Sequence, residues 1–161
     1  MHTGRLFALA GVIIGIIGLF TKALRTDGAG LLPNLHALNP AVPPSIPTVW
    51  GGLDTWAQIV LVVLIVVVVA LAVRGTRATA MDRNSSLTTA VIGVALLAYV
   101  IIKLLEAMDE ADSLQGAFAQ AAGAGAIPVA YTVSSGIGFF ILVVGTVLVV
   151  AGGLSGMRTK E

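Results

Sequence analysis

Four long apolar stretches constrain this sequence more than any other feature. They run over residues 6–24, 56–73, 87–105 and 136–154. A helix needs roughly 20 mainly apolar residues to cross a bilayer, at a rise of about 1.5 Å per residue. Each stretch therefore predicts a spanning helix, because an isolated strand in lipid would leave its backbone groups unpaired. The fold that we expect is all-α, a four-helix transmembrane bundle forming a single membrane domain over residues 1–161.

The composition agrees with a membrane protein. Hydrophobic residues make up 57% of the chain and charged residues only 11%, whereas a soluble domain carries about 25% charged residues. So few polar groups could not cover the surface of a water-soluble fold. The chain has no cysteine, which excludes disulfides, thiolate metal sites and cysteine nucleophiles. A net charge of +1 gives no reason to expect nucleic acid as a partner.

Lysine and arginine predict the orientation, because they gather on the cytoplasmic side. If both termini are cytoplasmic, the inside holds Arg5, Arg74, Arg77, Arg83, Arg158 and Lys160, and the outside holds Lys22, Arg25 and Lys103. We therefore expect a multi-pass protein of the inner (plasma) membrane with both ends in the cytoplasm. The first stretch could be read as a signal peptide, but no small-x-small cleavage pattern follows it promptly, so we expect it to be retained.

The first external segment, residues 25–55, holds five of the six prolines. Prolines fix the backbone and favour extended conformations, so this segment is predicted to be a stiff loop rather than a helical domain. Its tryptophans are typical of the membrane interface. The alternative is that the loop contacts a partner protein, and its candidate residues are Pro43, Pro44, Pro47, Trp50 and Trp56.

The second external segment follows the third stretch and favours an amphipathic continuation of that helix. One face collects Leu104, Leu105, Met108, Ala111, Leu114 and Phe118, and residues 123–126 with Pro128 are predicted to end it. Lys103 lies three residues before Glu106, which places the two on one face as an ion pair. The acidic stretch from Glu106 to Asp112 is either a solvated surface or a cation site, and it lacks the ligand order of an EF-hand.

Chemical motifs are hard to find. No ionisable residue lies deep in a stretch, and His2 and His36 both lie outside, so a bis-histidine haem within the bundle is not expected. We identify no catalytic, cofactor-binding or metal-binding residues, and we expect no cofactor. The arginine-rich inner loop, residues 74–83, is a candidate for lipid headgroups, but cytoplasmic positive charge accounts for it.

Glycine placement carries the remaining information. Glycines along one helix face let another backbone approach closely. The first stretch and its flank contain Gly4, Gly11 and Gly18 at intervals of seven, together with Gly15, and the fourth contains Gly138, Gly145 and Gly152. A seven-residue interval suits the crossing of about 20° found in bundles. The first and fourth helices are predicted to meet each other, or each to meet a partner protein.

The alanine-, valine- and glycine-rich stretches, with the closing run over residues 145–153, resemble small multi-span proteins of actinobacteria. In size and layout the chain resembles the accessory membrane subunits of Mce-type lipid transporters. This resemblance implies a role beside a larger membrane complex and assigns no residue.

The function that we expect is a non-enzymatic accessory or scaffolding subunit of an envelope complex, with larger membrane subunits and membrane lipids as partners and lipid transport as one setting. A small homo-oligomeric channel or carrier is the alternative, and an enzyme acting on lipid headgroups is a third.

Overall fold

The computed structural model describes residues 2–74 and 79–157 of the chain. Its α-helices are α1 (Thr3–Leu19), α2 (Leu32–Leu38), α3 (Thr55–Val73), α4 (Arg83–Gly123) and α5 (Ile137–Met157). Two short strands, β1 (Leu24–Arg25) and β2 (Ser134–Ser135), and two 3₁₀ turns, η1 (Ala29–Leu31) and η2 (Trp50–Gly52), complete the fold. The all-α prediction is confirmed. Arg77, Arg158 and Lys160, which entered the charge count, lie outside the described residues.

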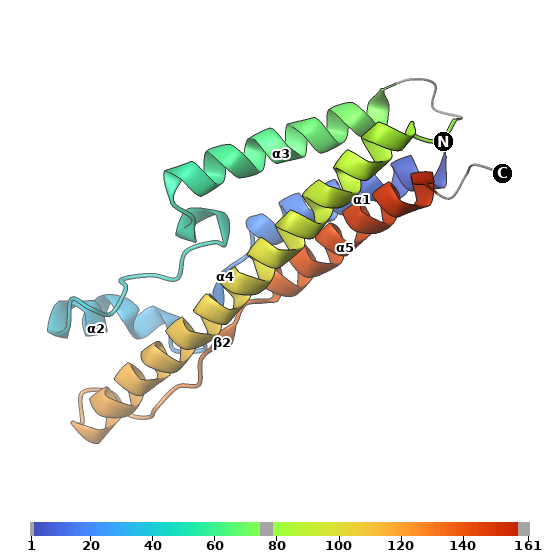
Figure 1. Ribbon diagram of the computed structural model, residues 1–161. Helices are drawn as coiled ribbons and strands as arrows, with labels where there is room; N and C mark the ends of the chain where they lie inside the picture. The colour runs from blue at the N-terminus through green and yellow to red at the C-terminus, as the bar shows by residue number, and fades with distance from the viewer. Residues whose placement is uncertain (1, 75–78, 158–161) are drawn as a thin grey trace.

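The long helices run alternately up and down, so the start of α1 and the end of α5 lie at the same end of the molecule (Figure 1). We call this the terminal end, and the end that carries α2, β1 and β2 the far end. Three helices, α3, α4 and α5, are long and apolar enough to cross a membrane. Helix α1 is also apolar but has only 17 residues.

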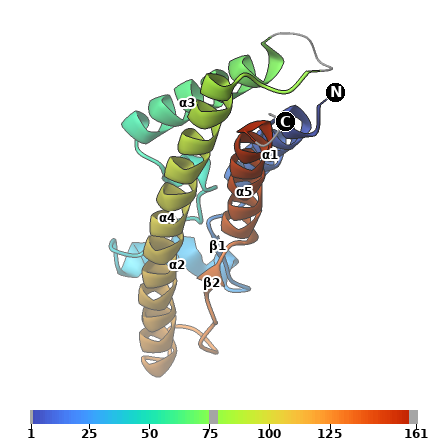
Figure 2. The same ribbon diagram turned by 45° about the vertical axis from the view of Figure 1, so that its right-hand side comes forward.

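Helix α5 packs closely along both α1 and α4, and α3 makes fewer contacts, with α1 and α4. Only Val68 and Ala72 of α3 are buried, and both lie in its C-terminal half. From there α3 and α4 diverge toward the far end, which both views of the ribbon show (Figures 1 and 2). The bundle is therefore centred on α5, which packs against both α1 and α4, and α3 leans away from α4 (Figures 1 and 2).

Helix α1 ends earlier than the sequence predicts. The apolar stretch was expected to stay helical to residue 24, but the helix stops at Leu19 and the chain becomes extended. The Ala23 N–H donates to the Pro47 carbonyl at 3.0 Å, and the Ala23 carbonyl accepts from the Gly136 N–H at 2.7 Å. Beyond it, Leu24 pairs with Ser135 in the antiparallel β1–β2 ladder. Segments remote in sequence thus take the backbone partners that a longer helix would have used.

Lys22 belongs to the same extended segment. Its ammonium donates to the Ile46 carbonyl at 2.8 Å. The backbone of Lys22 also bridges to Thr48. The side chain therefore ties the end of α1 to the proline-rich segment.

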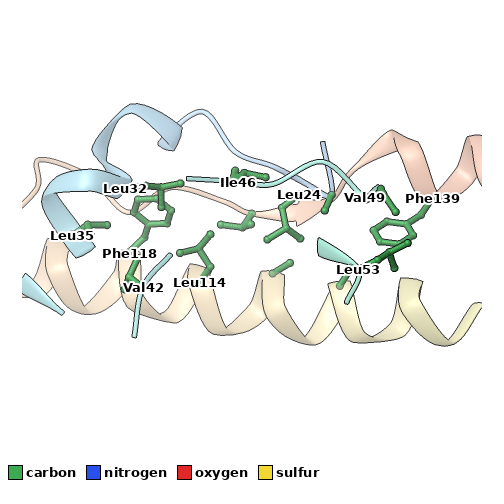
Figure 3. Close-up of a cluster of buried hydrophobic side chains, with 14 of the residues drawn as sticks. Leu24, Leu32, Leu35, Val42, Ile46, Val49, Leu53, Leu114, Phe118 and Phe139 are labelled. Atoms are coloured by element: carbon green, nitrogen blue, oxygen red, sulfur yellow. The ribbon is translucent and has the colours of Figure 1, made fainter. Parts of the chain in front are cut away.

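The proline-rich segment was predicted to be a stiff loop rather than a helical domain, and the structure shows one short helix in it, α2. Helix α2 begins at Leu32 with Pro33 in its first turn, where a missing backbone N–H does no harm. Leu32 and Leu35 are buried against the far half of α4 beside Phe118 (Figure 3). Leu32 and Phe118 are both 0% exposed. Apolar burial thus stabilises a helix that the proline content had argued against.

Helix α4 continues past residue 105 to Gly123, as the amphipathic pattern predicts. Its buried face in this region is Ala107, Ala111, Leu114 and Phe118, spaced as one helical stripe. Leu105 and Met108 were assigned to the same face, but they are 57% and 50% exposed. They lie to the side of the stripe, so the apolar face is narrower than predicted.

Candidate functional site

The structure brings the two glycine series together in the contact between α1 and α5. A Cβ placed on Gly18 would lie 2.9 Å from the Gly138 carbonyl oxygen, and one on Gly152 would lie 2.7 Å from that of Gly4. Such spacing leaves no room for a side chain, because the obstacles are backbone atoms. Gly15 differs, since a Cβ there would meet nothing within 4 Å.

A second close contact joins α5 to α4, and the sequence reasoning missed it. A Cβ on Gly153 would lie 2.5 Å from the Ala90 nitrogen, and one on Gly93 would lie 2.9 Å from the Val150 nitrogen. Gly153 directly follows Gly152 and faces another helix, so α5 presents small residues on two sides. The adjacent glycines were the available signal, because neighbouring helical positions face different directions.

Arg5 is a buried cation that sequence reasoning treated only as cytoplasmic charge. It is 3% exposed. Its guanidinium donates to the carbonyls of Ala72 at 2.8 Å, Thr79 at 2.9 Å and Ala80 at 3.3 Å, and also to that of Arg74. The last turn of a helix leaves carbonyls without partners and favours a nearby cation. Arg5 thus caps α3 and ties it to α1.

Polar side chains gather where α3 and α4 have separated. The Lys103 ammonium and a Glu106 carboxylate oxygen lie 2.6 Å apart, as the spacing predicted. The ammonium also lies 5.9 Å from the centre of the Tyr99 ring. Asp54 and Trp56, at the start of α3, line the same cavity as this pair. We call Asp54, Trp56, Tyr99, Lys103 and Glu106 the far-end polar cluster.

Lys103 lies where three cavities meet. One, of about 610 Å³, lies between α3 and α4. A second, of about 50 Å³, reaches inward among the four long helices. A third, of about 130 Å³, leads toward Val49, Leu53 and Phe139 under the far-end segments. The space between α3 and α4 is therefore hollow, and among the described residues that line it the cation is Lys103.

A larger groove, of about 750 Å³, lies on the far end itself. One wall is the proline-rich segment over residues 39–47, and the other is the stretch of α4 over residues 109–120. Val42, Ile46 and Leu114 give it an apolar floor, while Asp109, Glu110, Asp112 and Gln120 add polar groups. We call this the far-end groove.

The residues proposed for a partner loop fall in different places. Pro43 and Pro47 line the far-end groove and are exposed, and Pro44 is exposed beside them. Trp50 is half-buried, with its ring centre 6.3 Å from that of Phe20. Trp56 is 76% exposed and belongs to the far-end polar cluster. The prolines and the tryptophans thus serve different surfaces.

The acidic stretch from Glu106 to Asp112 is divided between two sites. Glu106 pairs with Lys103, whereas Asp109, Glu110 and Asp112 line the far-end groove. Within residues 2–74 and 79–157, no three His, Cys, Asp or Glu side chains are placed to hold a metal ion together. The prominent features are therefore the far-end groove and the cavity between α3 and α4.

Comparison with models of protein families, with curated proteins and with solved structures finds no match to this chain. The residues that line the far-end groove and the cavity between α3 and α4 are therefore the guide to its function.

Proposed function

We propose that this chain is an integral membrane protein of four spans, and a non-enzymatic accessory or scaffolding subunit of a larger envelope complex. Three helices have the length and hydropathy of spans. Helix α1, with 17 residues, reaches the lower limit for a span and lies along α5 from Gly4 to Gly18. Arg5, Arg74 and Arg83 at the terminal end support a cytoplasmic location for that end.

The observation that carries the proposal is the folded far end with its groove. Beyond the spans, a hydrophobic core holds α2, the proline-rich segment and the extension of α4 in fixed positions. A chain that needed only an anchor would not require such a core. The groove walls are held by buried Val42, Ile46 and Leu114, so little order has to be gained when a partner docks.

The lining of the groove supports a particular chemistry for the partner. Its apolar floor and proline wall suit an extended segment with apolar side chains. Asp109, Glu110 and Asp112 favour lysine or arginine in that segment. We infer that a basic, extended segment of a larger subunit docks here on the outer side of the membrane. A complex that moves lipid is one setting, the one implied by the resemblance to Mce-type accessory subunits.

The test is gentle-detergent purification of the tagged full chain, with partners identified by mass spectrometry and their recovery scaled to the inserted protein. Asp112→Lys reverses a charge in the groove. Asp27→Lys makes the same change at an exposed position that is not part of the groove lining. A larger partner should be recovered with the native chain and the Asp27 variant, and lost or strongly reduced with the Asp112 variant.

Other outcomes count against the proposal. Equal recovery with both variants would remove the groove from the interface. A native chain that purifies only with copies of itself would favour the alternative, a small homo-oligomeric channel or carrier. Cross-linking from Gly116 in the groove should capture the same partner, whereas cross-linking from exposed Gly30 should not.

A further inference from the structure

The wedge between α3 and α4 is open at one end and closed at the other. Arg5 joins α3 to the loop that precedes α4, and Val68 and Ala72 are buried near that junction. Toward the far end the two helices separate (Figures 1 and 2). The cavity of about 610 Å³ occupies this separation. We call this cavity, lined from Asp54 to Leu64 on one side and from Ala95 to Glu106 on the other, the slot.

The walls of the slot are hydrocarbon. Val60, Leu61 and Leu64 line it from α3, and Ala95 and Leu96 line it from α4. Leu61 and Leu96 also line the cavity of about 50 Å³ that continues inward. Both helices have the length and hydropathy of membrane spans. With the membrane placement proposed above, on which this inference rests, the medium that faces the slot is lipid rather than water.

The polar end of the slot carries charges of both signs. Lys103 is the cation, and Glu106 and Asp54 are the carboxylates. The side chains of Lys103 and Glu106 are 30% and 53% exposed, so both are reachable from outside. Trp56, which is 76% exposed, lines the same cavity. Indoles of this kind lie at the headgroup depth of membranes.

The apolar walls of the slot match the acyl chain of a phospholipid, and its charged end matches the headgroup. We propose that the slot binds a phospholipid with an ammonium-bearing zwitterionic headgroup, of the phosphatidylethanolamine class. One acyl chain lies between α3 and α4, the lipid phosphate pairs with Lys103, and the headgroup ammonium pairs with Glu106 or Asp54.

The charge balance of the cluster selects among headgroups. One cation and two carboxylates leave an excess negative charge, so a purely anionic headgroup meets repulsion that a zwitterion avoids. A phosphatidylglycerol-class lipid has no ammonium to offer the carboxylates. The slot therefore prefers the zwitterion even though a lysine is present.

Native mass spectrometry of the purified full chain tests this, with dioleoyl phosphatidylethanolamine and dioleoyl phosphatidylglycerol supplied in equal amounts. One bound lipid per chain is expected, with the ethanolamine lipid favoured by about threefold, as one exposed ion pair allows. Glu106→Gln removes a carboxylate and should shift the preference toward the glycerol lipid. Equal binding of the two lipids by the native chain would overturn the headgroup assignment.

The position of the lipid acyl chain is tested by filling the slot with a larger side chain. Ala95 is exposed and lines the slot, whereas Ala98 is exposed on the same helix and is not part of its lining. Ala95→Trp should remove the bound lipid, and Ala98→Trp should leave it in place. If both substitutions act alike, the slot is not the site. Failure of the protein to insert in the membrane would instead refute the proposed function. Cysteine labelling detects such a failure of insertion separately.

Discussion

Gly145 of α5 lies directly against the backbone of Gly11 in α1. A Cβ on Gly145 would come within 2.7 Å of the Gly11 carbonyl oxygen, and one on Gly11 within 2.5 Å of the Gly145 carbonyl oxygen. The relationship is reciprocal, so neither residue can gain a side chain without moving a helix. Contacts of this kind hold apolar helices together where burial from water contributes little.

Gly145→Leu should therefore destabilise the chain by about 1–3 kcal/mol, because the added side chain is forced against a backbone. Gly15→Ala is the matched control, since a Cβ at Gly15 meets nothing within 4 Å. We expect the Gly15 variant to match or exceed the stability of the native chain, because alanine favours helix. Thermal unfolding in detergent measures both, and a similar loss in the two variants would contradict the packing argument.

Arg5→Gln should destabilise the attachment of α3 to α1. The shorter side chain cannot reach all four carbonyls, and leaving them without donors costs about 1–3 kcal/mol. Arg83→Gln removes the same charge at an exposed position and controls for orientation effects. Unfolding temperature should fall for Arg5→Gln and stay near the native value for Arg83→Gln. Equal effects would show that charge, rather than the cap on α3, matters at Arg5.

The chain has no cysteine, so single introduced thiols report its orientation without background. Ser45, Ser113 and Asn84 are all exposed. Cysteines at Ser45 and Ser113 should react with an impermeant thiol reagent added to intact cells, and a cysteine at Asn84 should react only after the cells are opened. The reverse pattern would place the far end in the cytoplasm.

Asp82 makes the start of α4 sensitive to acid. Its carboxylate accepts from the Ser85 hydroxyl at 2.6 Å and from the Ser85 N–H at 3.2 Å. These hydrogen bonds, with a smaller contribution from the charge of Arg74, hold the pKa of Asp82 below its ordinary value of 3.8. The lowered pKa means that the ionised cap stabilises the fold above pH 3.8, and that this contribution is lost as pH falls through the folded pKa.

Asp82→Asn tests this, because asparagine caps a helix about as well but does not titrate. The unfolding temperature of the native chain should fall relative to that of the variant as the pH drops below 3.8. The difference between the two should be constant at neutral pH. Parallel curves throughout would show that the ionised cap contributes nothing.

Sequence patterns predicted the local elements of this fold well. The long helices, the extension of α4 and the Lys103–Glu106 pair all depend on contacts between residues close in sequence, and hydrophobic periodicity reports those directly. The early end of α1 and the existence of α2 depend on partners remote in sequence, such as Pro47 for Ala23 and Phe118 for Leu32. No local pattern contains that information.

The far-end groove and the slot were harder to predict, because they too depend on residues remote in sequence. Prolines and acidic residues were both noted, but only the folded chain sets the segment over residues 39–47 opposite α4. The slot arises because α3 is tied near its C-terminal end by Arg5 and diverges from α4 toward its other end (Figures 1 and 2). An arginine that caps a helix 67 residues away looks, in sequence, like any cytoplasmic charge.

Helix α4 runs through 41 residues without interruption, which makes it about 60 Å long. With the membrane placement proposed above, a bilayer core of about 30 Å would take up half of that length, and the other half would project beyond it. A change of about 10° in the tilt of the buried half would swing the tip by about 5 Å, given the rise per residue. On this proposal, the tilt that α4 takes in a bilayer of given thickness would set the position of one wall of the far-end groove.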